Sequence, residues 1–131
     1  MEEKIKLKFR VISASFAVCQ LAAADPVPQW AMNGIFTSVT RTADELSIVC
    51  PTENVPQEHK PETPWTCLKI EGPFAFSQIG ILHAFIQPIV EAGISVFVIA
   101  TYDTDYVLIQ KPFTDQAIQA LQNAGHKFLT E

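Results

Sequence analysis

The chain has 131 residues, with nine Lys and Arg against fourteen Asp and Glu, which gives a formal net charge of −5. Apolar residues make up 48% and charged residues 18%, a globular composition that excludes intrinsic disorder. The length allows one compact domain, or two very small ones sharing a core. The acidic balance argues against a broad nucleic-acid surface, because phosphate binding needs clustered Lys and Arg.

The sequence also bears on the cellular compartment. No apolar run reaches the roughly 18 residues that a membrane-spanning helix needs, and residues 1–4 are not followed by the apolar region of a signal peptide. Cys19, Cys50 and Cys67 are an odd number without metal-type spacing, which favours buried, reduced thiols. We therefore expect a cytoplasmic protein that has no membrane contact.

The N-terminal half is expected to consist of short strands. The apolar and polar pattern predicts strands over residues 4–12, 16–21, 35–40 and 45–50, with one helical turn over 29–32. Residues 53–64 hold three prolines and one apolar residue, which indicates a linker or a long surface loop. The predicted organisation is an N-terminal region over residues 1–52, the linker over 53–64 and a C-terminal region over 65–131.

The C-terminal half combines strand and helix periods. Strands are expected over 65–71, 94–100 and 106–110, and a short one over 128–129. A first helix carries the apolar stripe Ile79, Leu82, Ile86, Ile89 and Val90, with Ser77 as its predicted N-cap and Gly93 after its end. Pro88 should kink it.

A second helix follows Phe113, with Thr114 as the predicted N-cap and an inner face made of Ala117, Ile118, Leu121 and Ala124. The element order of the C-terminal half is therefore β, α, β, β, α and a possible β. This is the ferredoxin-like order of an α+β fold, with two helices on one face of an antiparallel sheet.

The two halves share an internal similarity at an offset of 61 residues. Phe36, Thr40, Asp44, Ile48 and Pro51 then coincide with identical residues in the second half, namely Phe97, Thr101, Asp105, Ile109 and Pro112. This pattern favours two copies of one hairpin unit. The alternative is that two unrelated hairpins share turn residues for local reasons. The N-terminal copy lacks room for two full helices, so we expect it to be trimmed.

The segments 36–51 and 91–109 resemble small tandem ACT-domain proteins and the ACT repeats of CASTOR-type cytosolic arginine sensors. The resemblance covers roughly residues 14–126 and is most specific at the helix Gly80–Ile94 and at the turn that follows. It implies a ferredoxin-like fold and side-by-side pairing. It also implies a small amino acid bound at an interface between repeats or subunits.

The resemblance places the ligand between the loop before the first helix, the start of that helix and the following turn. The implied binding residues are Ala75, Phe76, Ser77, Gln78, Gly80, Ile81, Thr101, Tyr102 and Asp105. Gln78 departs from the sensors, which have a carboxylate there, so a cationic side chain loses one partner. Helix N–H groups suit the ligand carboxylate, and Asp105 suits its ammonium group.

Some of these residues also have a purely structural interpretation. Asp103 and Asp105 are also typical turn formers, and Gly80 could simply allow close packing. His59, His83 and His126 are isolated, and the chain has no nucleotide loop, metal set or catalytic triad spacing. We therefore predict a non-catalytic regulatory module without a cofactor, which binds an amino acid and forms a homodimer because half-size repeats leave sheet edges uncovered. The alternative is a structural interaction module that binds no ligand.

Overall fold

The computed structural model describes residues 5–72, 74 and 79–130. The chain divides into two compact units. The central unit comprises residues 13–65, and the terminal unit combines residues 1–12 with 66–131. This division differs from the boundaries expected from the sequence, because the N-terminal segment belongs with the C-terminal half and the proline-rich segment 53–64 belongs to the central unit.

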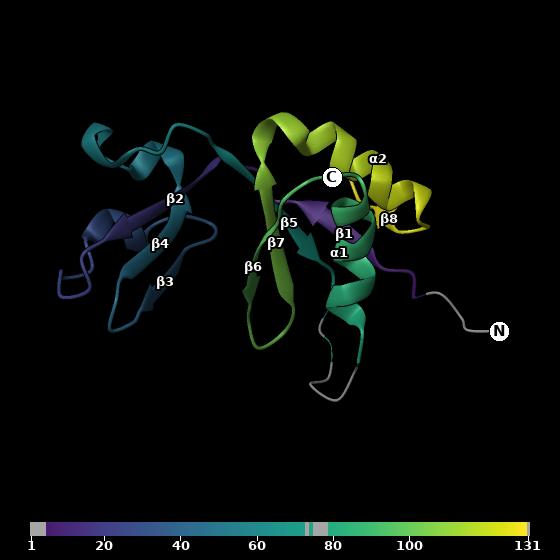
Figure 1. Ribbon diagram of the computed structural model, residues 1–131, viewed down its shortest axis with the longest axis horizontal. Coiled ribbons are helices and arrows are strands. Elements are labelled where there is room, and N and C mark those ends of the chain that lie inside the picture. Colours follow the sequence, from purple (N-terminus) through teal and green to yellow (C-terminus); the bar gives the residue numbers. More distant parts are fainter. Residues whose placement is uncertain (1–4, 73, 75–78, 131) are drawn as a thin grey trace. The chain divides into compact units, whose positions relative to one another are not determined.

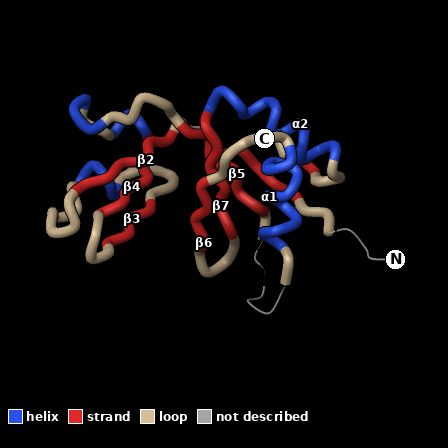
Figure 2. The backbone as a smooth tube through the Cα atoms, in the orientation of Figure 1, coloured by secondary structure: helices blue, strands red, loops and turns tan. Residues whose placement is uncertain are grey.

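The terminal unit has the mixed α+β architecture of a ferredoxin-like fold, as expected (Figures 1 and 2). Its described elements are β1 (Lys8–Val11), β5 (Trp65–Ile70), α1 (Ile81–Glu91), β6 (Phe97–Ala100), β7 (Asp105–Gln110), α2 (Thr114–Asn123) and β8 (Lys127–Phe128). In the sheet, β6 pairs with β7, β7 with β5, β5 with β1, and β1 with β8. Side chains of both helices share one core cluster with alternate residues of the strands, so both helices cover the same face.

Strand β1 lies between β5 and β8, a position that the sequence pattern did not indicate. It runs antiparallel to β5, with Phe9 opposite Ile70, and parallel to β8, with Phe9 opposite Phe128. The parallel pair is a departure from the expected antiparallel sheet. Phe9 is fully buried and its ring lies 5.2 Å from that of Phe128 and 5.5 Å from that of Phe85, measured between centroids. These contacts anchor the N-terminal strand in the core.

A buried histidine connects Leu7, the residue before β1, to α1. His126 is 4% exposed. The backbone N–H of Leu7 donates to its Nδ1 at 3.0 Å, and its Nε2 lies 3.0 Å from the carbonyl oxygen of Ala84. Since Nδ1 accepts, Nε2 carries the hydrogen and donates to that carbonyl. His126 therefore has a structural role in the terminal unit.

Helix α1 begins later than the sequence suggested. Gly80 occupies the N-cap position with a φ of 85°, a left-handed conformation that favours glycine. Ser77, which lies outside the described residues, is therefore not the N-cap. The buried stripe also shifts: Phe85 and Ile89 are fully buried, whereas Ile79 and Val90 are 90% and 53% exposed. The helix continues through Pro88 and ends at Glu91 before Gly93.

Helix α2 begins at Thr114, with Phe113 rather than Thr114 at the N-cap position. A short 3-10 turn, Lys111–Phe113, leads into it, and the Thr114 hydroxyl donates to the Lys111 carbonyl at 2.7 Å. Ala117 and Leu121 are fully buried as predicted, but Ala124 is exposed.

The central unit is a three-stranded sheet with short 3-10 turns. Strands β2 (Phe16–Leu21), β3 (Ser38–Arg41) and β4 (Leu46–Pro51) pair in the order β3–β4–β2, and the 3-10 turns are Gln29–Met32, Thr52–Asn54 and Gln57–His59. Its core comprises Ala17, Cys19, Ala31, Leu46, Ile48, Cys50 and Val55. The ring of Trp30 stacks on that of His59 at 5.9 Å. Residues 53–64 thus pack into this unit.

The hairpins β3–β4 and β6–β7 have the same construction, but at a different offset from the one predicted. Ser38 pairs with Val49, and Phe97 pairs with Leu108. The equivalent residues lie 59 apart (97 minus 38, and 108 minus 49), not 61. The predicted match of Asp44 with Asp105 is therefore wrong: Asp105 corresponds to Leu46. Because strand side chains alternate with a period of two, a shift of two residues keeps every side chain on its face, so the strand pattern could not reveal it.

Candidate functional site

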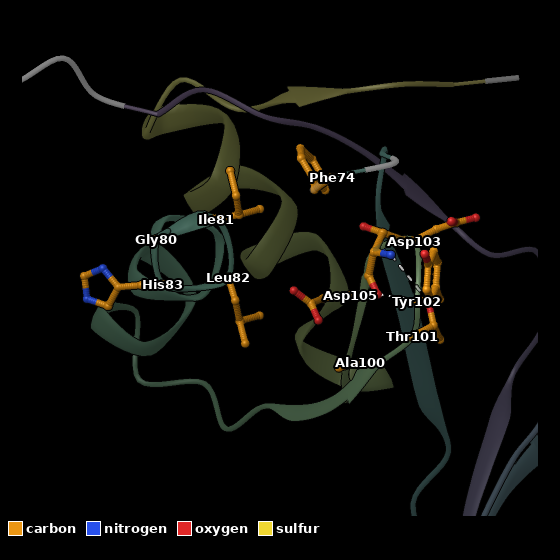
Figure 3. Close-up of a pocket in the computed structure, with 11 residues that line it drawn as sticks. Phe74, Gly80, Ile81, Leu82, His83, Ala100, Thr101, Tyr102, Asp103 and Asp105 are labelled. Atoms are coloured by element: carbon orange, nitrogen blue, oxygen red, sulfur yellow. Dashed lines mark hydrogen bonds between the residues drawn. The ribbon is translucent and has the colours of Figure 1, made fainter. Parts of the chain in front are cut away.

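A cavity in the terminal unit lies between the first turn of α1 and the turn from β6 to β7 (Figure 3). Its volume is about 350 Å³. The residues that line it are Phe74, Gly80, Ile81, Leu82, His83, Ala100, Thr101, Tyr102, Asp103, Thr104 and Asp105. A cavity of this size accommodates a small metabolite.

Hydrogen bonds hold the turn that forms one wall of the cavity. The N–H of Thr101 donates to the carbonyl of Thr104 at 2.8 Å, and the hydroxyl of Thr101 donates to the same oxygen at 3.0 Å. The buried hydroxyl of Thr104 donates to the carbonyl of Ile70 at 2.6 Å, which fastens the turn to β5. These bonds fix the backbone of the turn without using the side chain of Asp105.

Phe74, which precedes α1 in the chain, is bound to the same turn. The N–H of Phe74 donates to the carbonyl of Asp103 at 2.9 Å. Gly72 permits this approach, because a Cβ at that position would lie only 3.0 Å from the same carbonyl oxygen. Phe74 thereby stands beside the cavity as an apolar wall (Figure 3).

The start of α1 forms the opposite wall. The first intrahelical hydrogen bond runs from the N–H of Ala84 to the carbonyl of Gly80. The N–H groups of Ile81, Leu82 and His83 precede it and have no partner within the helix. No described side chain caps this end of α1. Exposed helix N–H groups together with the helix dipole favour a negatively charged group at this position.

Asp105 is the ionisable side chain that faces the helix wall from the sheet. It is the first residue of β7, pairs with Ala100, and is half-buried. Its carboxylate points into the space between Leu82 and the turn, whereas His83 points away from it (Figure 3). Desolvation by burial raises the pKa of the Asp105 carboxyl above its ordinary value. Among residues 5–72, 74 and 79–130, no hydrogen bond or ion pair compensates this carboxylate.

The structure brings five of the nine sequence-predicted site residues to the cavity: Gly80, Ile81, Thr101, Tyr102 and Asp105. The other four, Ala75, Phe76, Ser77 and Gln78, lie outside the described residues. Sequence reasoning missed six lining residues, which are Phe74, Leu82, His83, Ala100, Asp103 and Thr104. Five of the six directly adjoin a predicted site residue in the chain, and His83 lies two residues from Ile81, so complete turns rather than selected positions would have identified them.

The rest of the described chain was compared with the requirements of a metal site, a membrane-spanning helix and a reactive cysteine. In the ranges given above, His, Cys, Asp and Glu side chains nowhere gather in threes to hold a metal ion. None of the helices that the structure describes has the length and apolarity to span a membrane. The three cysteines are buried and unpaired, and burial raises the pKa of Cys67 to about 12.

Two family models match the sequence. The ACT domain matches residues 61–123, and a family described as an N-terminal domain matches residues 14–58. ACT domains are regulatory, ligand-binding modules, and neither model indicates a catalytic family. A search of functionally curated proteins finds no significant match.

Three solved structures are similar over nearly the whole chain. Protein Atu0741 from Agobacterium tumefaciens is 39% identical, with 97% of this chain and 95% of that chain covered and a TM-score of 0.90. VC0802 from Vibrio cholerae, described as a protein of unknown function and possible transport protein, is 21% identical, with 92% and 91% covered and a TM-score of 0.74.

The third similar structure is from the aspartokinase alpha and beta subunits. It is 12% identical, with 92% of this chain and 98% of that chain covered and a TM-score of 0.63. At these identities, the second and third structures support the fold alone. The identity and coverage of the first show common descent, and the chain therefore belongs to the family of Atu0741 and carries an ACT domain within residues 61–123.

Proposed function

We propose that the protein is a non-catalytic regulatory module and that its terminal unit binds a free amino acid in the cavity beside Asp105. The observation that carries this proposal is a half-buried carboxylate that no described group compensates, opposite the N-terminus of α1, which no described side chain caps. The ammonium group of a free amino acid can bind the carboxylate of Asp105, and its carboxylate can bind the N–H groups at the start of α1. Each such charge-assisted hydrogen bond contributes about 1.5–3 kcal/mol.

The remaining lining supports an amino acid rather than a larger anion. Phe74, Ile81 and Leu82 present apolar surface that can pack on an aliphatic side chain. With three or four polar contacts, and after the cost of immobilising the ligand, we expect dissociation constants in the micromolar to millimolar range. Such affinities suit a module that responds to metabolite concentration.

We further propose that the protein acts as a homodimer, with the ligand held close to an interface. Tyr102 lines the cavity and is 81% exposed, and Ile79, which precedes the lining residue Gly80 in the chain, is 90% exposed. A second chain that covered them would bury apolar surface and close the site. Light scattering should then give twice the chain mass of 14.5 kDa.

The similarity of the β3–β4 and β6–β7 hairpins supports a duplication in which the central unit is a trimmed copy of the ACT repeat. We also propose that the ligand is bound in the manner that the resemblance to arginine sensors implies, between the start of α1 and the following turn. This part of the proposal concerns the position of the ligand and not its identity. Related sequences should align residues 38–51 with 97–110, at the offset of 59.

The same exposed residues favour a second candidate, a structural interaction module that binds no ligand. Thermal unfolding with each of the twenty amino acids at about 10 mM separates the two. A ligand present at 100 times its dissociation constant adds about 2.7 kcal/mol to the unfolding free energy, which shifts the melting temperature by several degrees. If an amino acid shifts the melting temperature, its N-acetyl derivative, which lacks the ammonium charge, and its amide derivative, which lacks the carboxylate charge, should not shift it. No shift with any of the twenty supports the interaction module.

A further inference from the structure

The sheet of the terminal unit has a second face, opposite the helices, with a different chemistry. Phe9, Leu68 and Ile70 pack in the helix-facing core, so their neighbours along β1 and β5 point the other way. Towards β7 this second face carries apolar side chains, since Cys67 and Leu108 lie there and are fully buried. Towards β1 and β8 it is cationic.

Four basic side chains form this cationic region, which we call the basic cluster: Lys8, Arg10, Lys69 and Lys127. They are four of the nine Lys and Arg of a chain with a net charge of −5. Strand pairing sets them side by side, because Arg10 is opposite Lys69 and Lys8 is opposite Lys127. Lys8 and Lys127 are exposed, and Arg10 and Lys69 are half-buried.

The basic cluster is only partly neutralised. Arg10 forms an ion pair with Glu71, the acidic residue that follows β5 on the same face. No ion pair to Lys8, Lys69 or Lys127 occurs within the described portion of the chain. Like charges directly opposite each other on a sheet destabilise it. The arrangement therefore costs folding stability that an anionic partner would restore.

The spacing of the cluster fits an extended acidic peptide. Lys8 and Arg10 are two residues apart on one strand, roughly 6.6 Å, which is also the spacing of alternate side chains in an extended peptide. Neighbouring strands, about 4.8 Å apart, add Lys69 and Lys127 on either side. A nucleic acid fits less well, because a phosphate backbone extending past these four charges meets a chain of net negative charge.

We propose that the basic cluster is a docking surface for an acidic segment of another protein, with Asp or Glu at alternate positions. This inference goes beyond the amino-acid site and does not depend on it. It gives the regulatory module a contact surface on the face of the sheet remote from the cavity.

The experiment measures fluorescence anisotropy of a labelled peptide of alternating Glu and Ser, with the full-length protein at low salt. We expect saturable binding that weakens as salt rises. The double variant Lys8→Glu/Lys127→Glu should bind about tenfold more weakly or worse, since two attractive contacts become repulsive. Its melting temperature without peptide should stay close to that of the wild-type protein, because the opposed Lys8–Lys127 pair becomes an opposed Glu–Glu pair and the like-charge repulsion between β1 and β8 is retained.

The control is Lys60→Glu/Lys111→Glu, which makes the same change in net charge at exposed positions outside the basic cluster. This variant should retain the affinity of the wild-type protein within about twofold, because its charges lie beyond the contact. Absence of peptide binding at low salt, equal loss in both double variants, or tighter binding of a labelled single-stranded oligouridine would each overturn the proposal.

Discussion

Replacing Asp105 with Asn should separate ligand binding from folding stability. The substitution retains the shape of the side chain and removes its negative charge. In the structure, burial raises the pKa of this carboxyl and no described group compensates it. The backbone hydrogen bonds of the adjoining turn run through Thr101 and Thr104 instead. Asp105→Asn should therefore leave the turn intact.

The sign of the stability effect follows from the raised pKa. At acid pH, Asp105 is protonated in both the folded and the unfolded protein, so its carboxyl contributes nothing to the pH dependence of the unfolding free energy. As the pH rises above the ordinary Asp value of 3.8 and through the higher folded value, the ionised form becomes a penalty on the folded state. The Asn variant lacks this penalty. At pH 7 its melting temperature without ligand should equal or exceed that of the wild-type protein, and the difference should vanish near pH 3.

The same substitution should weaken ligand binding, although it does not weaken the folded state. Loss of one charge-assisted hydrogen bond costs about 1.5–3 kcal/mol, which corresponds to about a tenfold to hundredfold weaker dissociation constant. Isothermal titration calorimetry measures it, with Asp103→Asn on the same turn as the control. If Asp105→Asn instead lowers the unliganded melting temperature by several degrees while Asp103→Asn does not, Asp105 is a turn former and the assignment of the site is wrong.

Three further predictions concern the fold. His126→Ala leaves a buried N–H and a buried carbonyl unsatisfied and should lower the unfolding free energy by about 2–4 kcal/mol in urea titrations, whereas a loss below about 0.5 kcal/mol would contradict the buried contacts. Thr104→Val removes the hydroxyl that holds the turn to β5, so it should cost about 1–2 kcal/mol and also weaken ligand binding. The cysteines should resist an aromatic disulfide reagent at pH 8 until the protein unfolds, because burial raises the pKa of Cys50 to about 11 and of Cys67 to about 12; rapid native reaction would show that they are accessible.

The local elements of the fold could be predicted because each depends on neighbouring residues. The span 16–21 of β2 and the 3-10 turn over 29–32 agree with the sequence prediction, and the ferredoxin-like order of the terminal unit follows from strand and helix periods. The start of α1 was missed because Gly80, rather than a side-chain cap, sets it. Ile79 is apolar and lies three positions before Leu82, so its spacing matches the apolar stripe of the helix. In the structure it lies outside the helix and is exposed.

The placement of β1 could not be predicted, because it depends on partners distant in the chain. Alternation along residues 8–11 identifies a strand and its buried face, but it does not select β5 and β8 as neighbours. Leu7 and His126, which meet through a hydrogen bond, are separated by 119 residues. The basic cluster is hidden from the sequence for the same reason, since only pairing brings Lys8 beside Lys127.

The corrected hairpin offset leads to a prediction about stoichiometry. At the offset of 59, the central unit has Leu46, fully buried, where the terminal unit has Asp105. Residues 13–65, all of which the structure describes, contain no α-helix, so this unit also lacks the helix N-terminus that forms one wall of the cavity. Both charge-complementary groups are therefore confined to the terminal unit. Calorimetric titration should give one amino acid per chain, and Leu46→Asp should destabilise the protein by burying a charge without creating a second site. Two equivalent ligands per chain would refute the assignment of binding to Asp105 and α1.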